Sequence, residues 1–356
     1  MVSLFKKKTK TSTAFSIDDR NVRYVTVVRG GDGIQVEKYG SELFPDSIID
    51  DADVIINDAA FVARLRTLAQ GISCTDADVI IPDAVAHCFH THVAKVPGTS
   101  QEDIILDHLK TYCEAHGMLG YGEYISEYEI ILETHFGYDL HATLVPRKYV
   151  EHLQRLFRQA GVTVHHIETA HHAVAKSCVP IPVGHGFVAV SFGRKTTSVS
   201  LFNGTTIVAH DVVSVGVEDL YRTIEQQLNV SRTDSERIIT RHGVLRTHPD
   251  RTVLGELYLS LAPVIDSIDR MLVAIGTEPY KIFGHRFETG DIVVFGHGAL
   301  VKGLVGYLGE RTNLRPHELD VWVGRKNDRA PIMNLPAVET FIYAEPLSLA
   351  LLYLEN

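Results

Sequence analysis

Turns rich in glycine and polar side chains are the parts of this sequence that could do chemistry. Three of them stand where an apolar run ends or folds back: 18–21 (DDRN), 192–197 (FGRKTT) and 295–299 (FGHGA). Backbone N–H groups in such turns can converge on a phosphate, helped by a following helix N-terminus. In the third turn the small residues also allow close approach of a flat ring or a ribose. One such turn alone is more often structural, so the hypothesis of a phosphate or nucleotide site depends on all three turns together.

Histidines offer a second chemistry, metal binding. The candidates are His87, His90, His92 and the pairs His165-His166 and His171-His172. No paired cysteines and no H-E-x-x-H motif accompany them, and with 19 histidines in the chain chance clustering is expected. Ser191 and Cys88 lack a nucleophile-elbow motif. We therefore assign no metal site and no catalytic residue.

Two similar runs of strands must position the turns. FSIDDRNVRYVTVVRGGDGIQV near the start and VAVSFGRKTTSVSLFNGTTIVA nearly half the chain later share one layout of strand, turn, strand, turn and strand. Asn203-Gly204 between apolar runs is a strong hairpin signal. An internal duplication is the economical explanation, and it predicts two similar lobes facing each other across a cleft. The alternative is chance similarity of two hairpins.

Hydrophobic periodicity and capping residues predict the remaining elements. Strands are expected at 14–17, 22–29, 34–39, 78–81, 128–132, 140–145, 162–167, 187–190, 197–202, 205–213 and 291–295. Helices are expected at 58–70, 100–113, 146–160, 168–178, 217–228, 234–241, 251–275, 299–309 and 346–354. The segment 85–96 is expected to be extended.

These elements predict an α/β protein with four domains or subdomains. The first lobe comprises 1–85 and 146–180, and an inserted α+β subdomain comprises 86–145. The second lobe comprises 186–220 and 290–356, with a helix-rich subdomain at 221–289. The segment 179–184 (VPIPVG) is the clearest linker.

Composition limits the function classes. The chain has 356 residues, 45% hydrophobic and 22% charged, with a net charge of −10, which argues against nucleic-acid and anionic-membrane binding. The basic tail at Lys6, Lys7, Lys8 and Lys10 is a solvated end or a weak attraction to an anionic inner leaflet. Scattered cysteines, no apolar run of membrane-spanning length and no secretory signal predict a soluble cytoplasmic protein.

The ordered set of segments resembles the type IV pilus assembly protein PilM family, which is related to actin and to the division protein FtsA. The segments are LFKKK, IDDRNVRYV, VPRKYVEHLQRLFRQAGVTVHHIETAHHAVAKS, VAVSFGRKTTSVSLFNGTTIVAHDVVSVGVEDLYRTIEQQLNVSRTDSERI, VVFGHGALVKGLVGYLGERTNL and EPLSLALLYL. The resemblance implies an actin-like, ribonuclease-H-like duplicated two-lobed ATPase fold with a small inserted subdomain. It also implies two phosphate turns and a nucleotide-base turn. The residues carried over as cofactor-binding are Asp18, Arg20, Asn21, Gly193, Arg194, Lys195, Thr196, Thr197, Gly216, Gly296, Gly298 and Ala299.

Departures from the family pattern count against the hypothesis that the protein catalyses phosphoryl transfer. The first turn of the family usually reads Asp-Ile-Gly-Ser, whereas Arg20 and Asn21 stand here in place of Gly-Ser, next to an extra carboxylate that Arg20 could offset. The second turn usually begins with Asp, and Ser191 stands here in its place. That Asp is the expected metal-water or catalytic carboxylate, and a serine lacks its charge. ATP with Mg²⁺ is the implied cofactor, and these changes put its binding in question.

Two functions follow from the resemblance. The first is a scaffold at the inner face of the cytoplasmic membrane, in a type IV pilus or related secretion machine. It would bind the cytoplasmic tail of a bitopic PilN-like protein in a groove between the first lobe and the inserted subdomain, near 85–96 and 128–132. A pilus motor ATPase and self-association are further possibilities that are left open.

The second function is that of an ATPase or small-molecule kinase, for which Asp18 or Asp211 would supply the carboxylate. An FtsA-like filament is a related alternative. Because Ser191 counts against catalysis, we favour the scaffold and expect weak ATPase activity at most.

Overall fold

The computed structural model describes residues 10–18, 20–30, 33–44, 48–49, 55–178, 185–204, 206–277, 288–317 and 335–354. The chain divides into two compact units. The first unit comprises residues 1–82, 154–180 and 319–356, and the second comprises 83–153 and 181–318. Lys6, Lys7 and Lys8 of the basic tail and the linker at 179–184 lie outside the described residues.

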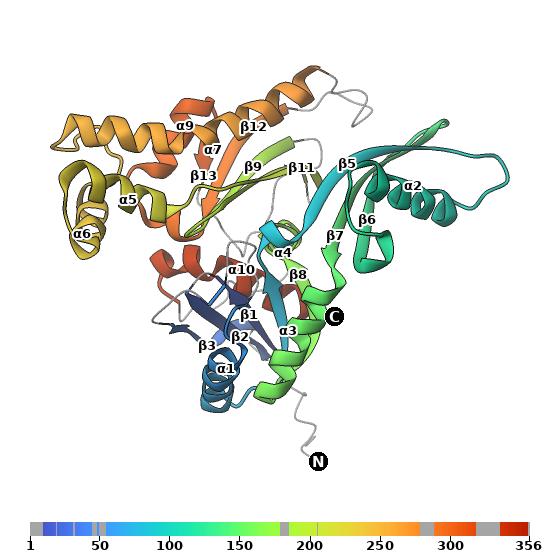
Figure 1. The fold of residues 1–356 in the computed structure, drawn as a ribbon, viewed down its shortest axis with the longest axis horizontal. Coiled ribbons are helices and arrows are strands. Elements are labelled where there is room, and N and C mark those ends of the chain that lie inside the picture. Colours follow the sequence, from blue (N-terminus) through green and yellow to red (C-terminus); the bar gives the residue numbers. More distant parts are fainter. Residues whose placement is uncertain are drawn as a thin grey trace, which may run out of the picture. The chain divides into compact units, whose positions relative to one another are not determined.

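The first unit is built on a five-stranded sheet with the order β3-β2-β1-β4-β8 (Figure 1). Strands β1 (Lys10–Ile17), β2 (Asn21–Gly30) and β3 (Gly33–Leu43) form an antiparallel meander. Strand β4 (Asp76–Ile81) then pairs parallel to β1, and β8 (Thr163–Thr169) pairs parallel to β4. Strand β2 is almost wholly buried because helices cover the sheet, so it reads as an apolar run without alternation.

Helices supply the first core. They are α1 (Asp58–Ile72), the second half of α3 (Arg147–Ala160), α4 (Ala170–Cys178) and α10 (Ala337–Leu354). Phe15 of β1, Phe61 of α1 and Phe157 of α3 are fully buried and meet ring to ring, with centroids 5.7 Å apart for Phe15–Phe157 and 6.1 Å for Phe61–Phe157. The Asn57 side chain caps α1 by accepting from the Ala60 N–H.

The second unit contains a sheet of the same design, with the order β11-β10-β9-β12-β13. Its strands are β9 (His185–Phe192), β10 (Thr197–Asn203), β11 (Thr206–Val213), β12 (Glu288–Phe295) and β13 (Arg315–His317). Its helices are α5 (Val217–Leu228), α6 (Arg232–His242), α7 (Arg251–Thr277), the short η3 (His297–Leu300) and α9 (Leu304–Thr312). Apolar residues of β9, β10 and β12 pack with α5, α7 and α9 into one core.

The internal duplication is confirmed by strand order and direction. In each sheet three consecutive strands form an antiparallel meander, and two later strands are added parallel to the first of them. Chance similarity of two hairpins would not produce two matching five-stranded sheets. The short strand β13 was not expected, because three exposed residues carry no hydrophobic pattern.

A three-stranded sheet forms the inserted module, in the order β5-β7-β6. Its elements are η1 (Asp83–Val85), β5 (His87–Ala94), α2 (Gln101–Ala115), η2 (Tyr121–Glu123), β6 (Tyr124–Glu133) and β7 (Gly137–Pro146). Helix α2 covers one face through Ile105 and Leu109, which pack on Val93 and Leu140. The predicted cap of α2 is present, since Ser100 accepts from the Asp103 N–H.

Two expected boundaries differ in the structure. Residues 290–356 were assigned to the second lobe, but α10 packs on β1, β2, β4 and α4 of the first unit. Helix α10 also begins at Ala337 and passes through Pro346, where the helix was expected to start. The reason is packing: Leu347, Leu351 and Leu354 are at most 2% exposed, and the first sheet and α4 together bury the helix. The inserted module groups with the second unit, whose β11 it contacts.

In the described part of the chain, no helix combines the length and the apolar character needed to cross a membrane.

Candidate functional site

The first predicted phosphate turn joins β1 to β2, and its polar groups bind one another. Asp18 Oδ1 accepts hydrogen bonds from the backbone N–H groups of Arg20 at 3.1 Å and Asn21 at 2.9 Å. The Asp18 N–H donates to the Asn21 carbonyl at 2.9 Å. The N–H groups at the positions where the family receives phosphate are thus bound to a carboxylate of the chain itself.

A buried arginine holds that carboxylate from its other side. Arg23 Nη1 lies 2.6 Å from Asp18 Oδ2, and the Arg23 side chain is only 8% exposed. The extra carboxylate that Arg20 was expected to offset, Asp19, lies outside the described residues. Arg20 donates from Nε to the Phe44 carbonyl at 3.2 Å and accepts from the Phe44 N–H at 2.8 Å. The turn is therefore tied to the end of β3.

The second predicted turn joins β9 to β10. The Gly193 N–H donates to the Thr196 carbonyl at 2.9 Å, which closes the turn, and Thr197 Oγ1 donates to the Val215 carbonyl at 2.6 Å. A Cβ atom added to Gly193 would lie 2.7 Å from the Thr196 carbonyl oxygen. Gly193 is thus required by the closeness of the turn.

Helix α5 begins directly on this turn. The N–H of Val217 donates to the Gly193 carbonyl at 3.1 Å, and that of Glu218 donates to the Arg194 carbonyl at 3.0 Å. An added Cβ on Gly216 would lie 2.1 Å from the Arg194 oxygen, so only glycine allows this approach. The first N–H groups of a helix are its anion-binding groups, and here two of them bind the turn's own carbonyls.

An ion-pair network fixes the Arg194 side chain beside the same helix. Arg194 and Arg232 of α6 both pair with Glu218, and Arg232 also pairs with Glu225 at 3.3 Å. The Arg232 guanidinium lies over the Tyr221 ring, 4.4 Å from its centroid. Burial opposes the charge of Arg232, but the hydrogen bonds and charge of Glu218 and its neighbours leave its pKa raised. The predicted phosphate ligand Arg194 is therefore part of a structural network.

The third turn packs against the second. Gly296 has a φ of 80°, and an added Cβ would lie 2.8 Å from the Phe192 carbonyl oxygen. An added Cβ on Gly298 would lie 2.3 Å from Cδ1 of the Phe192 ring. The Ala299 N–H donates to the Gly296 carbonyl at 3.2 Å, at the start of η3. Both glycines are needed because β12 ends against Phe192.

The structure thus brings together the predicted residues of the second unit. These are Gly193, Arg194, Lys195, Thr196, Thr197, Gly216, Gly296, Gly298 and Ala299. Asp18, Arg20 and Asn21 form their own turn in the first unit. Sequence reasoning missed Arg23, Glu218 and Arg232, which hold the two turns. Their only signal was charge, which surface residues share.

The proposed catalytic alternatives have structural partners. Ser191 lies in β9, opposite Ser198 of β10. Asp211 of β11 accepts from Ser267 Oγ at 2.7 Å and pairs with Arg270 at 3.1 Å, both on α7. Asp211 therefore anchors α7 to the edge of the second sheet.

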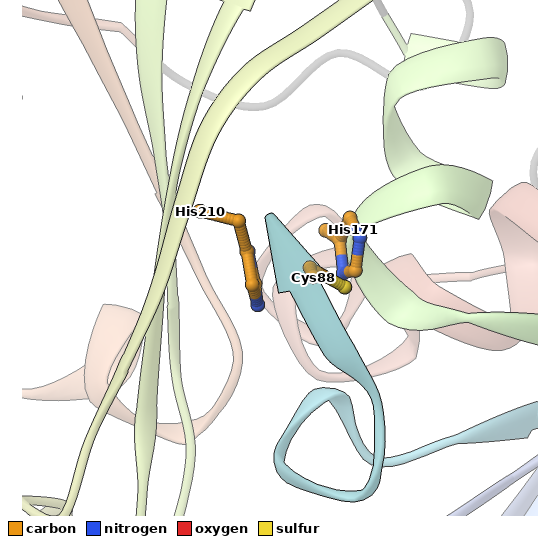
Figure 2. Close-up of side chains that lie close together, drawn as sticks. All are labelled: Cys88, His171 and His210. Carbon is orange, nitrogen blue, oxygen red and sulfur yellow. The ribbon is translucent and has the colours of Figure 1, made fainter. Parts of the chain in front are cut away.

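The histidines and Cys88 were also placed. Figure 2 shows Cys88 on β5 and His210 on β11, in the second unit, and His171, which belongs to α4 of the first unit. Burial raises the pKa of the Cys88 thiol to about 12, which disfavours a nucleophilic thiolate. His90 lies opposite His141 in the β5–β7 pair.

The remaining predicted histidines pair with nearby groups. His92 Nδ1 lies 2.8 Å from Asp139 Oδ1. His165 Nε2 lies 2.9 Å from Asp76 Oδ1, and His166 Nδ1 lies 2.7 Å from Asp78 Oδ1. His166 also stacks on Tyr353 of α10, with ring centroids 3.7 Å apart. These pairs link neighbouring strands and hold the end of α10 to β8.

Comparison with known proteins gives structural matches alone. The sequence matches no known protein family, and a search of curated proteins finds no match. The PilM–PilN type IV pilus biogenesis complex matches with a TM-score of 0.69 at 14% identity, covering 97% of this chain and 97% of that chain. The ethanolamine utilization protein EutJ from Carboxydothermus hydrogenoformans matches with a TM-score of 0.52 at 13% identity, covering 96% and 89%. MreB5 of Spiroplasma citri bound to ADP matches with a TM-score of 0.51 at 13% identity, covering 88% and 93%.

These matches and the duplicated sheets define the fold class. The chain has the actin-like ATPase fold, as the sequence predicted, with two matching sheets and a small inserted module. At identities of 13–14%, the similarity shows the fold. Function has to be argued from the turns and surfaces of this chain.

Proposed function

We propose that this protein is a cytoplasmic actin-like scaffold of a type IV pilus or related secretion machine, and that its nucleotide-type turns perform no catalysis. The observation that carries the proposal is the occupation of both phosphate turns by the chain's own groups. The Asp18 carboxylate binds the N–H groups of the first turn, and the start of α5 binds the carbonyls of Gly193 and Arg194. A phosphate would have to displace these bonds to bind there.

The carboxylates support the same view. Phosphoryl transfer in this kind of site needs a carboxylate that orients the nucleophile and helps to hold Mg²⁺. Asp18 is paired with Arg23, and Asp211 is bound by Ser267 and Arg270. Ser191 occupies the position of the remaining carboxylate of the family. We therefore propose that ATP with Mg²⁺ binds weakly and is not turned over.

For the partner, we propose the cytoplasmic tail of a PilN-like inner-membrane protein, which would keep the scaffold at the inner face of the membrane. The similarity to PilM from a PilM–PilN complex supports this partner. Strand β6 is an edge of the three-stranded sheet, to which an extended peptide can add as a further strand. Its Ile125 and Tyr128 are 41% and 37% exposed and lie on opposite faces of the strand, so each could contact side chains of the tail on its own face.

Calorimetric titration of the purified protein with ATP and Mg²⁺ tests the first part. We expect a Kd weaker than about 1 mM and no phosphate release. Tight Mg²⁺-dependent binding with turnover would reject the non-catalytic scaffold and favour the ATPase hypothesis.

Fluorescence titration with a labelled PilN-like tail peptide from the same organism tests the second part. Ile125→Asp with Tyr128→Asp should weaken binding by about tenfold or more, because both apolar contacts become charged. Val273→Asp on α7 is the control, since Val273 is 65% exposed and lies on a helix outside the three-stranded sheet. Equal binding by the double variant and the control would reject β6 as the tail site.

A further inference from the structure

A groove in the second unit is not accounted for by the scaffold proposal. It encloses about 530 Å³ between α7 and α9. From α7 it is lined by residues 251, 254, 255, 258, 259, 262, 265 and 266, which share one helical face. These positions span 15 residue steps, or about 22 Å at 1.5 Å per residue. The groove is thus long enough for a segment of several residues.

Helix α9 packs on part of this face. Tyr258 of α7 and Tyr307 of α9 stack with ring centroids 4.2 Å apart and planes at 3°. Arg246 Nη2 lies 2.7 Å from Glu310 Oε2, near the end of α9. Arg251 Nη1 donates to the Arg246 carbonyl at 2.6 Å. The tyrosine stack and the Arg246–Glu310 pair therefore hold α9 against α7 and the turn that precedes it.

Arginines outnumber carboxylates in the lining of the groove: Arg246, Arg251 and Arg311 stand against Asp266 and Glu310. Arg246 is neutralised by Glu310, but neither Arg251 nor Arg311 forms an ion pair with any residue in the described ranges. Both are exposed and line the groove. In a chain of net charge −10, two such guanidiniums beside an apolar groove favour a ligand with carboxylates.

The apolar part of the groove has open space beside Gly255. A Cβ added there would meet no heavy atom within 4 Å, so the glycine leaves space between the helical turns. Leu254 and Ile265 form a buried floor, at 4% and 6% exposed, while Leu259 is 67% exposed at the rim. Such a surface can receive an apolar side chain and would exclude water around it.

We propose that this groove binds an acidic peptide segment of a partner protein. One apolar side chain of the peptide would enter beside Tyr258 and Gly255, and its carboxylates would pair with Arg251 and Arg311. The length of the groove favours a peptide over a compact small molecule. The site stands independently of the tail site on β6, because it uses other elements and is tested with the purified protein alone.

Selection from a displayed library of random short peptides against the full-length protein tests the site. We expect binders that combine an apolar residue with Asp or Glu. The best binder is then synthesised with a fluorescent label, and its Kd is measured by fluorescence polarisation. Gly255→Leu should weaken it by about tenfold or more, because the new side chain fills the groove. Gly276→Leu is the matched control, since it is the same change on the same helix with open space around it.

A charge-reversal pair separates the arginine contacts from filling of the groove. Arg251→Glu with Arg311→Glu should weaken binding of the same peptide by about tenfold or more, and the loss should be greater at low salt. Lys110→Glu with Arg158→Glu changes net charge equally elsewhere and should leave the Kd unchanged. Circular dichroism confirms folding of each variant. Failure to select any binder, binders that are basic, or binding insensitive to Gly255→Leu would each overturn the proposal.

Discussion

The first and second turns occupy the same place in two copies of one sheet, yet different groups close them. Between β1 and β2 a side-chain carboxylate binds the backbone N–H groups and one buried arginine. Between β9 and β10 the backbone carbonyls of the turn accept hydrogen bonds from the start of α5. The close approach of Gly216 to the turn makes these bonds possible. The strands and the core preserve the topology, so the turn residues were free to diverge separately. The proposed loss of phosphate binding is therefore compatible with an intact actin-like fold.

The largest expected loss of stability comes from a substitution at the close glycine contact of the second turn. Gly216→Ala should lower the free energy of unfolding by about 4 kcal/mol, because the new Cβ would lie 2.1 Å from the Arg194 oxygen. Urea denaturation measures the change. Gly30→Ala at the end of β2 is the control: its Cβ meets nothing within 4 Å, and the cost should stay under about 0.5 kcal/mol. Equal losses would mean that the glycine approach does not hold the second turn.

The next effect concerns the carboxylate of the first turn. Asp18→Ala removes the acceptor of two N–H groups and leaves Arg23, which is 8% exposed, without that partner. We expect a loss of about 3 kcal/mol in unfolding free energy. Asp18→Asn keeps an acceptor oxygen but loses the charge, so it should cost about half as much. If both variants cost the same, the ion pair alone holds the turn.

A pH effect is expected in the inserted module, which contacts the edge strand β11 of the second repeat. His141 of β7 is 1% exposed, and burial, with the nearby His210 and His90, lowers its pKa from 6.5 to about 3. The folded state therefore keeps the ring neutral, while the unfolded chain takes up a proton near pH 6.5. Stability is fully present above that pH and falls as pH drops toward 3, by about 2 kcal/mol at pH 5.

Denaturation at pH 7.5 and pH 5 measures this loss, and His141→Gln should reduce it by about one proton's contribution. Other histidines with lowered pKa, such as His87 and His108, account for what remains. An unchanged pH dependence in the variant would show that His141 is not the residue responsible.

The smallest effect sharpens the contrast between the ion pairs of the two turns. Glu218→Gln removes a charge that Arg194 and Arg232 share, but Arg232 keeps Glu225 and Glu236. We expect a cost of about 1 kcal/mol by urea denaturation, well below that of Asp18→Ala. Glu236→Gln, on a side chain 49% exposed, is the control and should cost less. A cost as large as for Asp18→Ala would remove the contrast between the Asp18–Arg23 pair and the network that shares Glu218.

Much of the fold was predictable because it is local or repeated. Helix α5 begins and ends where periodicity and Gly216 indicated, and the Ser100 cap of α2 is present. The repeated hairpins implied two matching sheets, which strand pairing confirms. Asn203-Gly204 marks the β10–β11 turn, where Gly204 adopts the positive φ of 62° that glycine allows.

The site was predictable only in part. The positions of Gly193, Gly216, Gly296 and Gly298 were anticipated, but their reason was not: each gives room to a neighbouring turn or ring of this chain. The Asp18–Arg23 pair joins close positions in sequence, yet charge alone did not distinguish Arg23 from Arg20.

The sequence by itself determined the elements, their order and the duplication, because hydrophobic period and turn residues act over a few positions. Only the tertiary structure decided that α10 covers the first sheet, that α9 packs on α7, and that the turns bind their own polar groups. These outcomes depend on burial and hydrogen-bond partners far apart in the chain. A linear pattern does not encode which of many apolar faces or charges will meet.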